Sequence, residues 1–270
     1  MNFFPFTTEK KGSSSQESDD KWFTANKSFP TKEGKKFRAR FAVADGATEC
    51  SFSNIWADIL VRDYCNNGHK SAGGLERYIK KLSKKWSQNI SVDNLPWYAE
   101  EKVKNGAFST LLGFELEGVR LIDGIRQIKK QMAKEKTPRS GKWSSIAIGD
   151  SCLFQIRDKK MIKSFPIEKS TDFNSTPVLL SSNLLQNEMI LSSTHTFQGS
   201  WKIGDEFFIC TDAFAAWFLS ESEKNNTPWI EFYDVIENPD PHEKFKSWIS
   251  KQRESGLMKN DDTTVILIKL

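Results

Sequence analysis

The chain has 270 residues, of which 38% are hydrophobic and 12% aromatic, and this is enough apolar material for a buried core. Its formal net charge of +4 is mild, and its tryptophans lie on apolar faces without interleaved arginines, so we expect no nucleic-acid partner. No stretch approaches about 18 apolar residues, and the N-terminal residues lack the features of a signal peptide, so we expect a cytoplasmic protein with no membrane contact.

The cysteines and histidines argue against a zinc site. No two cysteines have the CxxC spacing, and each lies in an ordinary apolar or helical context: Cys50, Cys65, Cys152 and Cys210. This usage is typical of free thiols in a reducing compartment. The three histidines are scattered along the chain: His69, His195 and His242. A Cys/His zinc site needs closer spacing.

The first third of the chain predicts a core strand followed by helices. Residues 37–44, "FRARFAVA", alternate and then become continuously apolar, as a strand entering a core does. After Gly46, "SFSNIWADILVRDY" has apolar residues at helical spacing, and 75–90 repeats that pattern with a lysine-rich outer face. Two amphipathic helices in succession favour a helical layer over a sheet.

The middle third predicts strands with two irregular segments. Residues 108–118 and 143–158 are rich in β-formers, and a Gly149-Asp150 turn predicts that the second segment is a hairpin. A basic insert lies between them at about 119–142, where the lysines indicate a solvated helix face or a contact for an acidic partner. Residues 165–200 have little periodicity and predict a flap-like loop.

The last third predicts a strand, helices and a closing strand. "DEFFICTDAFAAWFLS" changes from strand to helix at Asp212, and 228–255 predicts one or two further amphipathic helices. "DDTTVILIKL" ends the chain as a strand that begins with acids. Because we find no repeat and no interdomain linker, we expect one domain over residues 1–270.

Acidic residues recur at strand ends. They are Asp19 and Asp20 before "WF", Asp45 after "FAVA", Asp150 after "SIAIG", Asp212 after "FFICT", and Asp261 and Asp262 before "TTVILI". Each alone could be a helix cap or a turn residue. Acids gathered at neighbouring strand ends repel one another, however, and persist only if protons or cations neutralise them. Oxygen ligands without nearby His or Cys favour Mg²⁺, Mn²⁺ or Ca²⁺.

In this order, the motifs resemble those of the metal-dependent Ser/Thr protein phosphatases of type 2C, the PPM class. The matching stretches are "SDDKWF", "VADGATE", "FSTLLGFEL", "IGDSCLF", "CTDAFAAWF" and "NDDTTVILI", and they span the chain from about Thr8 to Leu270. The "DGATE" form is similar to a divergent bacterial branch. The resemblance implies an α+β fold, a four-layer αββα sandwich with two central antiparallel sheets.

The resemblance also implies a site with two Mg²⁺ or Mn²⁺ ions and room for a third. In it, Asp45 bridges two ions and the Gly46 carbonyl is a further ligand, while Asp212 and Asp261 complete the second ion's shell. Asp20 acts at or near the first ion, with Asp19 where the family often has Glu, and Asp150 holds the third. Asp45 and Asp20 are the residues we expect to be catalytic.

The implied activity is hydrolysis of phosphoserine and phosphothreonine in a phosphoprotein substrate, by direct attack of a hydroxide that bridges the two ions. A cognate Ser/Thr kinase is the implied signalling partner, and we expect a monomer. The chain departs from the family in lacking an arginine shortly before Asp19 and in having Ala47, Ala213 and Asp262 where His, Gly and Asn are frequent. These departures leave two alternatives open: a weak or inactive pseudophosphatase that acts as a regulatory binding module, and a regulatory module for a partner kinase.

Overall fold

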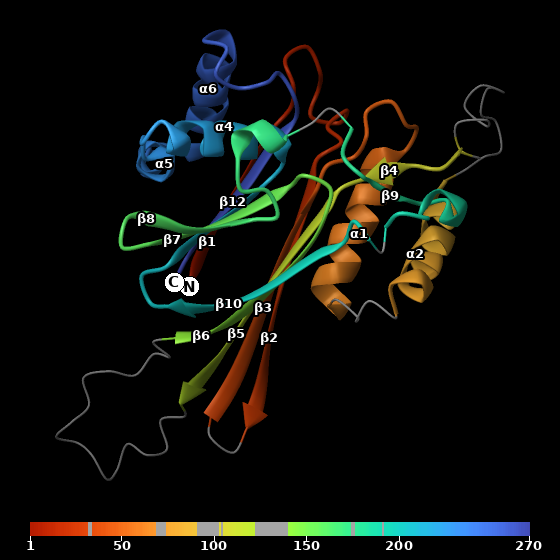
Figure 1. Cartoon of the computed structure of the whole chain (residues 1–270), viewed down its shortest axis with the longest axis horizontal. Helices are drawn as coiled ribbons and strands as arrows, with labels where there is room; N and C mark the ends of the chain where they lie inside the picture. Colours follow the sequence, from red (N-terminus) through yellow and green to blue (C-terminus); the bar gives the residue numbers. More distant parts are fainter. Residues whose placement is uncertain are drawn as a thin grey trace.

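Two five-stranded antiparallel sheets form the centre of the computed structural model, which describes residues 1–31, 34–68, 74–90, 103, 105–121, 140–173, 176–190 and 192–270. The first sheet has the order β1 (Asn2–Thr8), β12 (Thr263–Lys269), β11 (Glu206–Cys210), β7 (Cys152–Arg157) and β8 (Lys160–Phe165). The second has the order β10 (His195–Lys202), β6 (Ser140–Ile148), β5 (Leu111–Leu121), β3 (Gly34–Ala44) and β2 (Lys21–Thr31). The two chain ends lie side by side because Asn2 pairs with Lys269 (Figure 1).

Helices cover the outer faces of both sheets (Figure 1). On the second sheet lie α1 (Ser53–Asn67) and α2 (Leu75–Asn89), and on the first lie α4 (Asp212–Glu223), α5 (Pro228–Ile236) and α6 (Pro241–Glu254). Smaller elements are the strand pair β4 (Phe108–Ser109) and β9 (Leu180–Ser181) and the 3₁₀ turns η3 (Ser170–Asp172) and η4 (Leu184–Gln186). The predicted four-layer αββα sandwich is therefore confirmed.

The strand that leads to Asp45 shows why the layers pack as they do. Alternate side chains of a strand point to opposite faces. Phe41 and Val43 accordingly face the other sheet, whereas Ala42 and Ala44 face α1. The alanines are small, so α1 can pack close to the strand, and its residue Trp56 is fully buried there. The continuous apolar run thus reflects burial on both faces.

The predicted hairpin at Gly149-Asp150 is wrong. Strand β6 belongs to the second sheet and β7 to the first, so this turn carries the chain from one sheet to the other. Gly149 has a φ of 90°, a conformation that favours glycine. A turn motif fixes the local bend but not the strands' partners, which are set by long-range packing. The crossing places Asp150 where the two sheets meet.

The two irregular segments are shorter than predicted. Residues 119–121 and 140–142 of the basic insert are the ends of β5 and β6, and 122–139 lie outside the described residues. Within the predicted flap, β10 pairs with β6 from His195 onward, and His195 itself is exposed. Strand β10 lies at the sheet edge and is largely exposed, so its sequence lacks the apolar alternation of a core strand.

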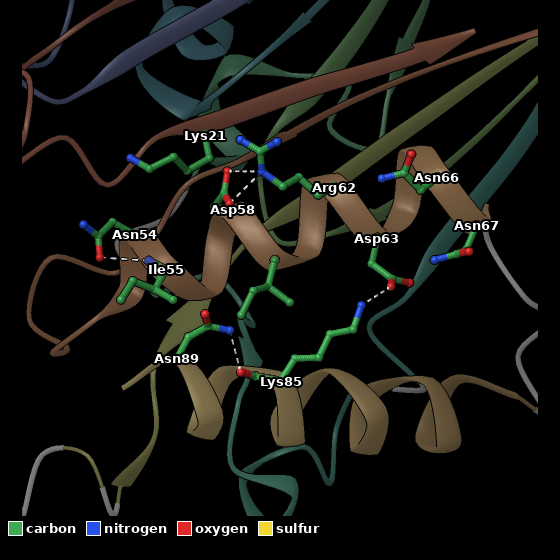
Figure 2. A pocket seen from close by; sticks show the side chains of 11 residues that line it. Lys21, Asn54, Ile55, Asp58, Arg62, Asp63, Asn66, Asn67, Lys85 and Asn89 are labelled. Atoms are coloured by element: carbon green, nitrogen blue, oxygen red, sulfur yellow. Dashed lines mark hydrogen bonds and ion pairs between the residues drawn. The ribbon is translucent and has the colours of Figure 1, made fainter. Parts of the chain in front are cut away.

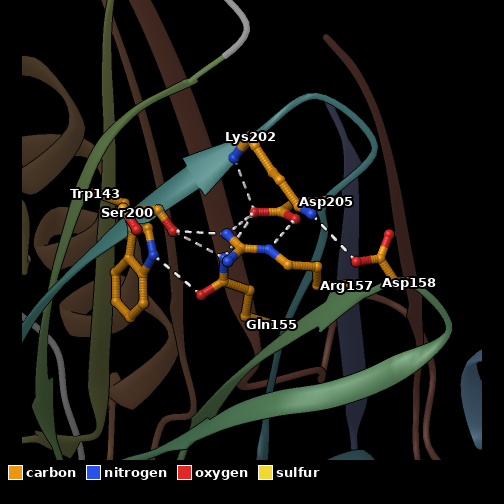
Figure 3. A network of polar contacts seen from close by, with 7 residues as sticks. All are labelled: Trp143, Gln155, Arg157, Asp158, Ser200, Lys202 and Asp205. Carbon is orange, nitrogen blue, oxygen red and sulfur yellow. Dashed lines mark hydrogen bonds and ion pairs between the residues drawn. The ribbon is translucent and has the colours of Figure 1, made fainter.

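A polar network joins the two sheets at the end of β7 (Figure 3). The Asp205 carboxylate is fully buried and accepts hydrogen bonds from Arg157 Nε and Nη2 at 2.7 Å and from Gln155 Nε2 at 2.8 Å. From the second sheet, Trp143 Nε1 donates to Gln155, and the Ser200 carbonyl accepts from Gln155 and Arg157. Because both sheets contribute, the network fixes how they lie on each other.

Three further expectations concern the chain as a whole. The four cysteines, all within the described residues, form no disulfide, and three of them are buried. Across the described ranges, no helix is both long and apolar enough to cross a bilayer. That residues 1–270 form one domain stays a prediction.

Candidate functional site

Five of the predicted acidic residues gather at one end of the sandwich. Asp20 precedes β2, Asp45 follows β3, and Asp150 lies at the crossing from β6 to β7. Asp212 opens α4, and Asp261 shortly precedes β12. The charge of Asp45 is repelled by the other four carboxylates: Asp20, Asp212, Asp261 and Asp150. Residues from both sheets therefore meet in one acidic cluster.

The backbone of Asp45 is held by Ser109, the last residue of β4, and by Thr110, which follows it. Thr110 Oγ1 accepts from the Asp45 amide at 2.9 Å, and Ser109 Oγ and the Thr110 amide donate to its carbonyl at 2.9 and 2.8 Å. Both backbone polar groups of Asp45 are thus used within the protein. The carboxylate of Asp45 belongs to the acidic cluster.

Gly46 and Asp19 pack against the start of α1. A Cβ at Gly46 would come within 2.9 Å of the Ser53 carbonyl carbon, so only glycine fits without a shift. The Gly46 amide donates to the Asp19 carbonyl at 3.4 Å, and Ser53 Oγ donates to Asp19 Oδ1 at 2.7 Å. Asp19 therefore lies beside Asp45 but is bound to the helix. That the Gly46 carbonyl is a metal ligand stays a prediction.

Two buried carboxylate oxygens of the cluster lack a partner. Asp20 is 3% exposed, and its Oδ2 accepts from Thr211 Oγ1 at 2.9 Å. In the described part of the chain, its Oδ1 and Asp212 Oδ1 have no hydrogen-bond partner. Leaving a buried charged oxygen unsatisfied is costly. A proton or a cation would satisfy these atoms.

Four carboxyl groups of the cluster have a raised pKa and so resist ionisation: Asp20, Asp45, Asp150 and Asp212. Burial, and then repulsion between the acids, raises the pKa of Asp20 and Asp45 well above the ordinary range. For Asp150, burial and the charge of Asp212 raise the pKa to about 7. Burial likewise raises the pKa of Asp212, although the ammonium of Lys259 opposes the change. At Asp19, burial outweighs the Ser53 hydrogen bond and also raises the pKa.

Two lysines of this site were not predicted from the sequence: Lys259 and Lys10. Lys259 Nζ is 2.7 Å from Asp261 Oδ2 and 3.4 Å from Asp212 Oδ2. Lys10 Nζ donates to Thr48 Oγ1 at 3.1 Å, two residues beyond Gly46. The signal for Lys259 is the stretch "MKNDD", in which a cation stands beside the acids. For Lys10, nothing in the sequence indicates the contact.

The donors fit a hard divalent cation by their chemistry. They are carboxylate oxygens, two of them without a partner, beside a glycine carbonyl. As the side chains stand, no group of three or more Asp, Glu, His or Cys residues within the described ranges is arranged to hold a metal ion. Lys259 Nζ lies between two of these acids, and like charges keep the carboxylates apart.

Solved structures with this architecture cover nearly the whole chain. The serine/threonine phosphatase PstP/Ppp of Mycobacterium tuberculosis matches with a TM-score of 0.52 and 13% identity, over 100% of this chain and 98% of that one. The catalytic domain of PstP in complex with two manganese ions matches with a TM-score of 0.51 and 12% identity, over 98% and 96%. A bacterial serine phosphatase matches with a TM-score of 0.51 and 11% identity, over 99% and 96%.

This chain has the type 2C phosphatase fold. The resemblance seen in the motifs is thus confirmed at the level of the fold, which is what identities of 11–13% establish. No protein-family model and no curated protein sequence matches the chain.

A hollow of about 430 Å³ adjoins the acidic end of the type 2C fold. Lys10 and Asn260 line it, so it reaches the residue before Asp261. Lys11, Lys246 and Arg253 add positive charge, and Glu9 and Glu254 add negative charge. The lining thus carries more positive than negative charge, and none of the five acids of the cluster belongs to it.

A second hollow, of about 530 Å³, lies between α1 and α2 (Figure 2). Four of its charged side chains form two ion pairs: Arg62 Nε is 2.7 Å from Asp58, and Lys85 Nζ is 2.9 Å from Asp63. Asp63 is buried, yet the pKa of its carboxyl is lowered because the lysines outweigh burial. These pairs indicate a structural role, and the acidic cluster remains the candidate site.

Proposed function

We propose that this chain is a metal-dependent phosphatase that hydrolyses phosphoserine and phosphothreonine in proteins. The observation that carries the proposal is the meeting of five carboxylates at one end of a type 2C fold, with two of their buried oxygens unpartnered. Similar solved structures are named as Ser/Thr phosphatases, and one of them contains two manganese ions.

The residues that would hold two Mg²⁺ or Mn²⁺ ions are those of the acidic cluster. Asp45, the Gly46 carbonyl and Asp20 would hold one ion, and Asp45, Asp212 and Asp261 would hold the other. Asp150 is the candidate ligand of a third ion, and Asp19 the candidate outer partner of the first. When bound, such ions make water nucleophilic at neutral pH and offset the charge of a phosphoryl group.

The chain's own residues prepare the site in three ways. Ser109 and Thr110 fix the backbone of Asp45, so its carboxylate is positioned before any ligand arrives. Thr211 holds one oxygen of Asp20 and leaves the other available. Lys10 stands at the hollow beside the acids, where we propose that its ammonium contacts the phosphoryl oxygens in place of the missing arginine.

The proposed substrate is a phosphoprotein made by a cognate Ser/Thr kinase, and we propose that the protein acts as a monomer in the cytoplasm. The test is release of phosphate from phosphoserine, phosphothreonine and phosphotyrosine peptides with and without Mn²⁺. The proposal expects Mn²⁺-dependent release from the first two peptides and loss of release in Asp45→Asn. Equal release by Asp45→Asn would contradict it.

A second candidate is a pseudophosphatase that binds a phosphoprotein without turnover. The observation that favours it is the position of Lys259, whose ammonium contacts Asp212 and Asp261 where a metal ion is proposed to bind. This candidate expects phosphopeptide binding that is unchanged by EDTA, with no phosphate release at saturating Mn²⁺.

A further inference from the structure

The ammonium group of Lys259 lies between two carboxylates of the acidic cluster. Its Nζ is 2.7 Å from Asp261 Oδ2 and 3.4 Å from Asp212 Oδ2. These two acids come from different elements, the start of α4 and the segment before β12. A single ammonium therefore offsets two negative charges that would otherwise repel each other.

The backbone around Lys259 is held on both sides. Met258 is 5% exposed and packs into the core between the first sheet and α4–α6. On the other side, Asn260 Oδ1 accepts from the Lys11 amide at 2.8 Å. The Lys259 side chain, by contrast, is 66% exposed. The ammonium can thus move into water while the backbone stays in place.

Arg253, the neighbouring cation, is bound differently. Its guanidinium donates to the Glu9 carbonyl at 2.9 Å, to Thr263 Oγ1 at 3.0 Å and to the Asp261 carbonyl. These contacts tie three segments of backbone together, so Arg253 serves the fold. Within the described part of the chain, Lys259 Nζ contacts carboxylates only, and they are the carboxylates that a metal ion would use.

We propose that Lys259 competes with the second metal ion: its ammonium takes the place between Asp212 and Asp261, and a divalent ion binds there only when the side chain swings out. The proposal rests on the proposed function in assigning these two acids as metal ligands. It predicts that the second ion needs a higher free metal concentration than the first. Lys259 would then set the metal level at which the complete site forms.

The size of the effect follows from the exposure of the pair. Ion pairs with an exposed partner are weak. A metal ion should therefore displace the Lys259 ammonium at a small cost in free energy. Removing it should tighten the weaker metal site by about three- to tenfold. Because the positive charge of Lys259 causes the competition, Lys259→Arg should leave the affinity of the second site for Mn²⁺ low.

The test is titration of the metal-free protein with Mn²⁺, with free Mn²⁺ measured by electron paramagnetic resonance. The variants are Lys259→Gln and Lys259→Arg, with Lys160→Gln as a matched control at an exposed lysine at the start of β8. We expect the dissociation constant of the weaker site to fall about three- to tenfold in Lys259→Gln alone. In addition, metal-free Lys259→Gln should melt at a lower temperature than the wild type, because the repulsion between Asp212 and Asp261 is no longer offset.

The possible failures are distinguishable. If the wild type and Lys259→Gln bind two Mn²⁺ ions with equal constants, the competition is refuted and the metal centre stands. If no variant binds Mn²⁺, both the competition and the metal-dependent function are refuted. If Lys259→Arg binds as tightly as Lys259→Gln, the charge is not the cause and the inference is overturned.

Discussion

Thr211 donates its hydroxyl to Oδ2 of Asp20 at 2.9 Å, while the other oxygen of that buried carboxylate has no partner among the described residues. The protein thus provides a hydrogen bond to only one of the two carboxylate oxygens of Asp20. Buried polar atoms are rarely left unpaired without a functional reason. This half-satisfied carboxylate, beside four other acids, is the physical basis for expecting a cation.

The first prediction concerns that hydrogen bond. Thr211→Val removes the donor and leaves both oxygens of Asp20 unpaired, so the free energy of unfolding should fall by about 1–3 kcal/mol. Thr211→Ser keeps the hydroxyl and should retain most of the stability. Urea denaturation of the metal-free proteins measures both. A Thr211→Ser variant that is destabilised as much as Thr211→Val would contradict this prediction, because serine keeps the hydroxyl that valine lacks.

The second prediction concerns metal and stability. Mn²⁺ should raise the melting temperature of the wild type, since a ligand at a hundred times its dissociation constant stabilises by about 2.7 kcal/mol. For a chain of this size, that corresponds to roughly 5–10 °C. Asp45→Asn should lose this increase, yet melt higher than the wild type in EDTA because one repelling charge is gone. Differential scanning calorimetry with and without Mn²⁺ makes the comparison, and an unchanged Mn²⁺ response in Asp45→Asn would refute the assignment of Asp45.

The third prediction concerns Gly46. A methyl group there meets the Ser53 backbone at 2.9 Å, so Gly46→Ala must push the loop away from α1. Overpacking of this kind costs about 1–3 kcal/mol. Because the same loop carries Asp45, Mn²⁺ binding should weaken as well. Thermal melting and Mn²⁺ titration test the two effects, and a variant with wild-type behaviour in both would show that the loop adapts freely.

The fourth prediction concerns pH and the Asp205 network (Figure 3). Burial alone would raise the pKa of Asp205, but hydrogen bonds from Arg157, the Lys202 amide and Gln155 outweigh it and lower the pKa. A carboxyl with a lowered pKa in the folded state stabilises the protein above the unfolded pKa of about 3.9. That contribution is lost as the pH falls through the folded value.

Asp205→Asn should therefore be less stable than the wild type by about 2–4 kcal/mol at pH 7, with the difference shrinking below about pH 4. Asp158→Asn, at the exposed ion pair with Lys202, should change stability little. Denaturant unfolding at several pH values measures the difference. A constant difference from pH 7 to pH 3 would contradict the assignment.

The sequence sufficed to predict the layers and most of the acidic cluster. Strands such as β3 are buried on both faces, and their apolar runs end abruptly at acids such as Asp45. Both the strand and the acid that ends it can therefore be recognised in the sequence. The order of the motifs resembles that of type 2C phosphatases, and this resemblance predicted which strand ends lie together. Local patterns and their order were enough here because the site lies at strand ends.

Pairing between strands could not be predicted in the same way. The Gly149-Asp150 turn has the local form of a hairpin, yet β6 and β7 join different sheets. Strand β10 is a largely exposed edge, so its residues carry no apolar alternation. Lys259 was missed because its role depends on Asp212, which is far away in sequence. Each of these features is decided by contacts between distant segments.

We propose that the acidic cluster catalyses metal-dependent hydrolysis of phosphate esters. This proposal is tested most directly by the rate of p-nitrophenyl phosphate hydrolysis at saturating Mn²⁺, for the wild type, Asp45→Asn and Asp212→Asn. We expect a Mn²⁺-dependent wild-type rate that falls by about 10²-fold or more in both variants. A wild-type rate no higher than that of the folded variants would contradict it.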